Sequence, residues 1–188
     1  IFCEDGYFTV EDTKRLLDAT TQRNEAGTVN LASFLSLFLV SYGYQPNCIA
    51  EVGTYIGNSA LSMSYGSSLH GQPIQLFTCD QNPCNKKPLE GIQLPEGSEE
   101  NILRGSSTEM FQLLARKNIK IDMLHLDGRL LDDDLEILPN LISNETLIAL
   151  DDCQHDEKGH KNLFLLRSKF NFLTDSHVYV SPFLRKVF

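Results

Sequence analysis

The sequence predicts an α/β protein, with a Rossmann-like, doubly wound and mostly parallel sheet of seven strands that the whole 188-residue chain forms as a single domain. Short apolar runs alternate with longer helix-compatible segments, which is the pattern of parallel strands joined by crossover helices. The first run, Cys48–Val52, ends in a glycine and leads into a helix-compatible stretch that starts at Asn58. The last two runs, 177–180 and 183–187, are separated by only two residues, so they can pair only as an antiparallel hairpin.

Two helices are expected ahead of the first strand. The segment 9–12 has the residue types of a capping pair, which predicts the start of the first helix. In the second helix, 30–42, apolar residues cover a wide face, so this helix should be well buried. Together they form an N-terminal helical cap, residues 1–47, on a core that spans residues 48–188. The cap could cover the substrate side of the core or contact a second copy of the chain, which makes a homodimer one option.

The rest of the core continues the alternation of strands and helices. The segment 81–100 contains three prolines and two glycines, so it is expected to be a long irregular loop. Pro139 is expected to end the helix that precedes it. Strands are expected at 75–80, near 102–103, at 121–127 and at 146–151, and helices at 58–65, 108–117, 131–138 and 158–170.

Composition disfavours several classes of function. The formal net charge is −9 and the basic residues are scattered, whereas contact with nucleic-acid phosphates needs clustered Lys and Arg. No apolar run reaches the roughly 20 residues that a membrane helix needs, and no basic leader of a signal peptide is visible. Five cysteines without a CxxC pair favour a reducing compartment. We therefore expect a cytoplasmic protein with neither a nucleic-acid nor a membrane partner.

The stretch 48–60 predicts a ligand-binding loop. Gly53 and Gly57 lie where a side chain would block a ligand's approach to the backbone, or the packing of the helix on the strand. The helix start that follows offers free N–H groups to a carboxylate or a phosphate. Glu51 is a charged residue within an apolar strand, so a cationic group is expected near it. Tyr55 occupies the place of the second glycine of the dinucleotide fingerprint, which disfavours a nicotinamide-dependent oxidoreductase.

Four of the predicted strands end in acidic residues. These are Glu51, Asp80, Asp127 and the pair Asp151-Asp152. The carboxyl ends of parallel strands meet at one edge of a sheet, and α/β proteins bind their ligands there. We therefore expect these carboxylates to surround one shared hollow.

The glycine loop with its preceding acid, together with Asp80 at the end of the second strand, resembles the class I methyltransferases, which bind S-adenosylmethionine. The resemblance implies that Asp80 accepts hydrogen bonds from the two ribose hydroxyls, and that the turn after the third strand lies beside the adenine. An ordinary strand–turn–helix junction with surface acids is the alternative. The residues implied for cofactor binding are Glu51, Gly53, Thr54, Tyr55, Gly57, Ser59, Asp80, Ser106, Ser107 and Asp127.

Two further motifs narrow the resemblance. His-Leu-Asp-Gly at 125–128 and Leu-Asp-Asp at 150–152 resemble the metal-dependent O-methyltransferases of the catechol and sugar types. That resemblance implies that Asp127, Asp151 and Asp152 hold one divalent ion, and three carboxylates suit Mg²⁺. It also implies a small-molecule methyl acceptor whose hydroxyl is acidified by the metal and aligned with the activated methyl group.

The general base of these enzymes is missing from its usual positions. The catechol type has a lysine three residues after the Asp of the fourth strand, where this chain has Leu130. Many sugar-type enzymes have Asp or His two residues after it, where this chain has Arg129. His155, just beyond the aspartate pair, is the best substitute, and His125 is expected to be structural. Arg129 could pair with Asp132, hold an anionic substrate, or mark a site that has lost catalysis.

Other interpretations of the same residues stay open. The changed base positions favour a non-catalytic binding domain on the same fold, as part of a larger polypeptide. The acidic run 132–134 is expected to be a solvated helix start that favours the helix dipole. Three cysteines and His155 lack the ligand spacing of a zinc site.

Overall fold

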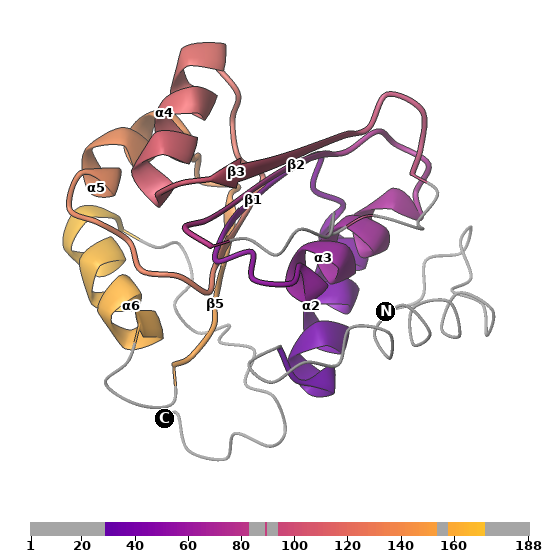
Figure 1. The fold of residues 1–188 in the computed structure, drawn as a ribbon, viewed down its shortest axis with the longest axis horizontal. Helices are drawn as coiled ribbons and strands as arrows, with labels where there is room; N and C mark the ends of the chain where they lie inside the picture. Colours follow the sequence, from indigo (N-terminus) through magenta and orange to yellow (C-terminus); the bar gives the residue numbers. More distant parts are fainter. Residues whose placement is uncertain (1–28, 83–88, 90–93, 154–157, 172–188) are drawn as a thin grey trace.

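The computed structural model describes residues 29–82, 89, 94–153 and 158–171. Within them lies a five-stranded parallel sheet with helices on both faces (Figure 1). The Rossmann-like parallel sheet is therefore confirmed for five of the predicted strands, while the predicted hairpin at 177–187 lies outside the described residues. The strands are β1 (Cys48–Val52), β2 (Gln75–Asp80), β3 (Glu99–Arg104), β4 (Met123–Leu126) and β5 (Leu147–Leu150), in the order β3-β2-β1-β4-β5.

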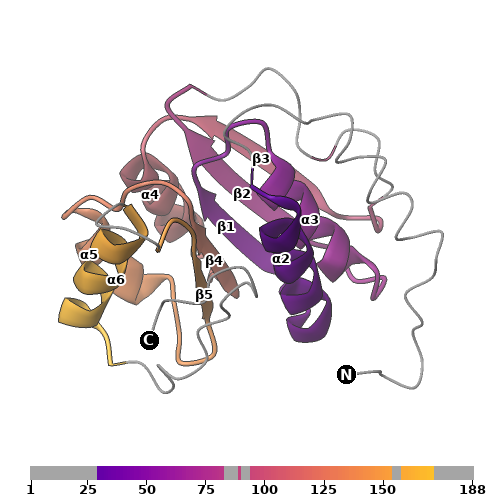
Figure 2. The ribbon, with the colours of Figure 1, turned by 90° about the horizontal axis from the view of Figure 1, so that it is seen from below.

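Two layers of helices cover the sheet (Figures 1 and 2). On one face lie α2 (Leu31–Tyr44) and α3 (Asn58–Ser68), and on the other lie α4 (Ser107–Lys117), α5 (Asp134–Ile137) and α6 (Lys158–Lys169). Successive side chains of a strand point to opposite faces. Ala50 of β1 therefore packs in the core beneath α4 and α6, and Ile49 packs in the core beneath α2 and α3. Glu51 follows Ile49 by two residues and faces α3.

Most predicted elements are present with shifted ends. β1 and β2 have the predicted bounds, and α4 and α6 differ by one residue at one end. α3 continues to Ser68, and β3 begins at Glu99, because the Glu99 N–H bonds to Ile74 next to β2. β4 and β5 are shorter than predicted. The helix predicted at 131–138 is present but shorter: α5 covers only Asp134–Ile137, and a 3₁₀ turn, Leu138–Asn140, follows it and contains Pro139.

The described part of the predicted cap is α2. Its first turn is capped by Asn30, whose Oδ1 accepts a hydrogen bond from Ser33 N at 3.0 Å. The helix continues two residues beyond the predicted end at residue 42 and stops where Gln45 adopts a left-handed conformation. It packs on α3, where Ser62 Oγ donates to the carbonyl of Phe34 at 2.5 Å. The helix predicted at 9–12 lies outside the described residues. None of the described helices has the length and apolar composition that crossing a bilayer requires.

Candidate functional site

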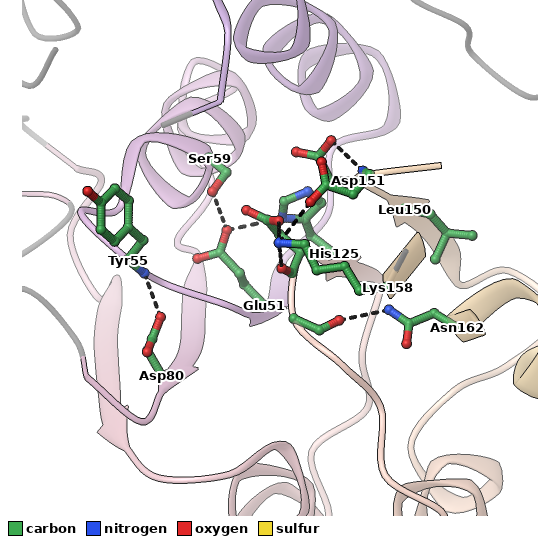
Figure 3. Close-up of polar contacts among 12 residues, drawn as sticks. Glu51, Tyr55, Ser59, Asp80, His125, Leu150, Asp151, Lys158 and Asn162 are labelled. Carbon is green, nitrogen blue, oxygen red and sulfur yellow. Dashed lines mark hydrogen bonds and ion pairs between the residues drawn. The ribbon is translucent and has the colours of Figure 1, made fainter. Parts of the chain in front are cut away.

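The candidate site lies at the carboxyl ends of β1 and β4. Here β2 lies on one side of β1 and β4 on the other, so the strand order reverses. Parallel sheets bind their ligands at such a switch point. A hollow at this point is lined by Val29, by residues 54–59 of the glycine loop and by Asp127. Figure 3 shows this edge of the sheet, with Glu51, Asp80 and Asp151 near the strand ends. Of the strand-end acids predicted to surround one shared hollow, only Asp127 lines it in the described part of the chain.

Gly53 allows two strand exits to pack against each other. Its φ is +102°, and an added Cβ would lie 2.9 Å from the carbonyl carbon of Asp127 and from the nitrogen of Gly128. Its N–H donates to the carbonyl of Cys79 in β2 at 2.9 Å. The two reasons predicted for this glycine were a ligand's approach and the packing of the helix on the strand, whereas the close contact is with the backbone that follows β4. The ends of β1, β2 and β4 are thereby held together under the loop.

Asp80 is joined directly to the glycine loop. Its Oδ2 accepts a hydrogen bond from the backbone N–H of Tyr55 at 2.9 Å (Figure 3). Its Oδ1 accepts one from the backbone N–H of Asn82 at 2.8 Å. Each oxygen of an ionised carboxylate has two lone pairs, so both can accept a further donor. The Tyr55 side chain is exposed beside it. The acid predicted to meet a ribose and the loop predicted to meet the rest of a cofactor therefore form one unit.

A buried polar row crosses the sheet beneath the loop. Glu51 pairs in register with Thr78 of β2 and with His125 of β4, and it is fully buried. Its carboxylate accepts hydrogen bonds from Thr78 Oγ1 at 2.7 Å and from Ser59 Oγ at 2.5 Å, and lies 3.1 Å from His125 Nδ1. The cationic group that was expected near Glu51 is therefore the His125 side chain. The Glu51 oxygens face the protein interior in this structure, and the predicted cofactor contact of Glu51 stays a prediction.

The buried row supports the loop from below. Burial by itself lowers the pKa of His125, but the hydrogen bond and charge of Glu51, together with nearby aspartates, raise it above the ordinary 6.5. Thr54 and Ser59, two of the predicted cofactor contacts, line the hollow and also bond to the row, Thr54 through a 2.6 Å contact with Thr78. His125 is structural, as predicted, and its partner is the acid of the glycine-loop motif.

The turn after β3 is only partly open to a ligand. Ser106 caps α4, with its N–H donating to Glu109 Oε2 at 2.7 Å in a capping box. Ser107 is buried, and its hydroxyl donates to Asp134 Oδ2 at 2.5 Å. The prediction of a solvated acidic run is therefore wrong for Asp134, which is fully buried and also accepts from the N–H of Leu131. Of the predicted serine pair, only Ser106 lies at the accessible side of the turn.

A lysine that the sequence prediction overlooked lies in the predicted metal site. Lys158 Nζ donates to Asp127 Oδ1 and to the Asp127 carbonyl, both at 2.5 Å, and lies 3.0 Å from Asp152 Oδ2 (Figure 3). Asp151 is adjacent, and its Oδ1 accepts from Asp152 N at 2.8 Å. In the described part of the chain, no group of three or more His, Cys, Asp or Glu side chains is arranged to hold a metal ion. Two of the predicted ligands, Asp127 and Asp152, come together, but around an ammonium group.

The docking of α6 places this lysine. Gly159 lies so close to the strand exit that an added Cβ would be 2.1 Å from the carbonyl oxygen of Asp151. Farther along α6, Asn162 Nδ2 donates to the carbonyl of Gly128 at 2.8 Å. The start of α6 is thus fixed to the exits of both β4 and β5. A lysine in the first turn of a helix is unfavourable to the helix dipole. This unusual position was the one sign in the sequence that Lys158 has a role in the site, and no such sign marked Asn162.

The charges of this group depend on one another. Burial raises the pKa of Asp127, the hydrogen bond and charge of Lys158 oppose that rise, and the charge of Asp151 adds to it; the net pKa is about 6. Burial lowers the pKa of Lys158, but hydrogen bonds and charges from Asp127 and Asp152 outweigh it and raise that pKa above 10.5. At neutral pH the ammonium is therefore charged and Asp127 is ionised.

The usual base positions hold no acid or base in this structure. Leu130 is buried in the core beneath α4 and α6, and Arg129 is exposed. Among the described residues there is no ion pair between Arg129 and Asp132. His155, the predicted substitute base, lies outside the described residues.

Comparisons with known proteins give matches of structure and none of sequence. No family model matches the chain, and a search of the curated proteins finds no match. The O-methyltransferase from Bacillus cereus, solved in complex with SAH, is 15% identical, with 85% of this chain and 77% of that chain covered at a TM-score of 0.55. The O-methyltransferase TomG from Streptomyces achromogenes, solved with SAM, is 17% identical, with 85% and 77% covered at 0.56. CalS11, a TDP-rhamnose 3'-O-methyltransferase, is 14% identical, with 86% of each chain covered at 0.54. This chain therefore has the fold of these methyltransferases.

Proposed function

We propose that this chain is an S-adenosylmethionine-dependent methyltransferase that acts on the hydroxyl of a small molecule. The observation that carries the proposal is the hydrogen bond between Asp80 and the backbone of Tyr55, which joins a strand-end acid to the glycine loop at the switch point of the sheet. The similar structures from Bacillus cereus and Streptomyces achromogenes, solved with SAH and SAM, support it. The net charge of −9 supports a small-molecule acceptor over a nucleic acid.

The residues at the hollow fit this cofactor. α3 begins after Gly57 with no side chain capping its first turn, and that turn borders the hollow. A helix start attracts a carboxylate, which S-adenosylmethionine carries at its methionine end. Asp80 keeps two oxygens able to accept from ribose hydroxyls. Ser106, at the turn after β3, is the remaining candidate beside the adenine.

In the proposed reaction the chain binds and orients, because the methyl group is already activated. When bound, S-adenosylmethionine supplies an electrophilic methyl on a positively charged sulfur. The glycine loop and Asp80 fix the two ends of the cofactor, and the acidic edge near Asp127 favours its positive charge. The acceptor oxygen has to lie in line with the methyl group, so alignment is the main contribution of the site. We assign no general base.

Mg²⁺ does not fit the site as it is built. Two of the three predicted ligands, Asp127 and Asp152, already bond to the ammonium of Lys158. A Mg²⁺ ion needs oxygen ligands at about 2.0–2.1 Å in near-octahedral geometry. We therefore derive no step that uses a metal.

A non-catalytic binding domain is the second candidate. Leu130 occupies the position of the catechol-type lysine and is buried in the core, so no base can act from there without refolding of this turn. This candidate predicts that the cofactor binds and that no acceptor is methylated. Methyl-transfer screening against phenols and sugars, with and without Mg²⁺, separates the two.

Calorimetric titration with S-adenosylhomocysteine tests the proposal. We expect the wild-type protein to bind, and Asp80→Asn to bind at least about tenfold more weakly, since a hydrogen bond to a charged group contributes about 1.5–3 kcal/mol. Asp133→Asn is the matched control, because Asp133 is an exposed acid outside the site. Failure of the wild-type protein to bind S-adenosylhomocysteine would refute the proposal, and tight binding of NAD would favour an oxidoreductase instead.

A further inference from the structure

We propose that the ammonium of Lys158 takes the place of the divalent cation at the exits of β4 and β5, so that this site works without a metal. The inference rests on the proposed function, because it concerns the acceptor side of the same site. It goes beyond that function, since the resemblance by sequence implies Mg²⁺ at these carboxylates and not a lysine.

The contacts of Lys158 are those of a bound cation. An ammonium has three N–H donors, and three oxygens surround this one: Asp127 Oδ1 and the Asp127 carbonyl at 2.5 Å, and Asp152 Oδ2 at 3.0 Å. The two exits that a metal would bridge are therefore already bridged. All three N–H donors of the ammonium therefore have a protein oxygen as partner in this state.

Lys158 also supplies the charge that these acids need. Asp127, Asp151 and Asp152 place three carboxylates at one edge, and carboxylates that share a site repel one another. The Asp127 side chain is only 19% exposed, so water alone compensates its charge poorly. A divalent ion could enter only if Lys158 left, and the closely packed Gly159 fixes the backbone from which the lysine extends. The cation of the site is therefore part of the chain.

If this is correct, removal of the lysine should uncover a metal site. The test is Mn²⁺ binding, by calorimetry and by the electron paramagnetic resonance signal of free Mn²⁺, to the wild-type protein, to Lys158→Met and to Lys161→Met. Lys161 is exposed on the same helix and is the matched control. We expect Lys158→Met to bind Mn²⁺ at least about tenfold more tightly than the other two proteins, because only this change frees carboxylate oxygens. Its melting temperature should rise on addition of Mn²⁺.

Two results would overturn the inference. One is stoichiometric Mn²⁺ binding by the wild-type protein, and the other is a folded Lys158→Met that binds Mn²⁺ no better than wild type. Lys158→Gln, which keeps a hydrogen-bond donor, is the second variant should the methionine variant not fold. Should neither fold, the wild-type titration still decides, because metal binding there contradicts the proposal and its absence supports it. All titrations are done without cofactor, so failure of the proposed function would appear separately, as absent S-adenosylhomocysteine binding.

Discussion

Replacing His125 by leucine should destabilise the protein strongly, although His125 touches no ligand. The change leaves Glu51 fully buried with hydrogen bonds from Ser59 and Thr78 and without its cationic neighbour at 3.1 Å. Removal of one partner of a buried ion pair costs about 3–5 kcal/mol. The matched control is His70→Leu, because His70 bonds to a neutral acceptor, the Tyr42 carbonyl at 2.7 Å. That loss should cost only about 0.5–1.5 kcal/mol from the hydrogen bond.

Urea denaturation measures the coupling energy between Glu51 and His125 from a double-mutant cycle. The cycle uses His125→Leu, Glu51→Gln and the double variant Glu51→Gln/His125→Leu, and His70→Leu is measured beside it. Residues in one polar network couple by about 0.5–3 kcal/mol, and we expect the upper part of that range here because the pair is buried. The pKa of His125 is raised in the folded state, so its stabilising charge is fully present below pH 6.5 and is lost as the pH rises through the folded pKa. The destabilisation should therefore be smaller at pH 9 than at pH 6.5.

Two outcomes would refute this reasoning. If His125→Leu costs no more than His70→Leu, the pair does not act as an ion pair. If the coupling energy between Glu51 and His125 is below about 0.5 kcal/mol, the buried row is not a network. A cofactor role for the Glu51 side chain would instead appear as weakened S-adenosylhomocysteine binding with unchanged stability.

Three further perturbations test the parts of the site separately. Gly53→Ala should lower the free energy of unfolding by about 2–4 kcal/mol, because it adds a clash with the backbone of Asp127 to an unfavourable φ. The control Gly71→Ala has a φ of +73° but open space around it, so it should lower the free energy of unfolding by only about 1–2 kcal/mol. Equal losses for the two variants in denaturation would contradict this. The pKa of Asp127 is raised from 3.8 to about 6, so its contribution to stability is fully present below pH 3.8 and lost as the pH rises through about 6. Between pH 3.5 and 7 the wild-type protein should therefore lose about 3 kcal/mol relative to Asp127→Asn, and parallel pH profiles would count against it. Ser107→Ala should lower the free energy of unfolding by about 1–3 kcal/mol, because buried Asp134 loses a donor, and an unchanged denaturation midpoint would exclude this role.

Local patterns made much of the site predictable. The apolar runs at β1 and β2 fixed their ends to the residue, since a glycine and an acid terminate them within the sequence itself. Because parallel strands bring their carboxyl ends to one edge, the acids at 80, 127, 151 and 152 could be assigned to that edge without a structure. The cap of α4 is local in the same way, because it depends on two residues three positions apart, Ser106 and Glu109.

Partners that are distant in the sequence could not be predicted in this way. Glu51 and His125 are 74 positions apart, and only the register of β1 against β4 brings them together. Lys158 reaches Asp127 across 31 positions because Gly159 lets α6 dock against the exit of β5. Composition and spacing thus determined which acids and which glycine loop meet at one edge of the sheet, because strand ends and turns are set by neighbouring residues. Only the tertiary structure decided which cation each carboxylate meets, because strand register and helix docking depend on packing across the whole core.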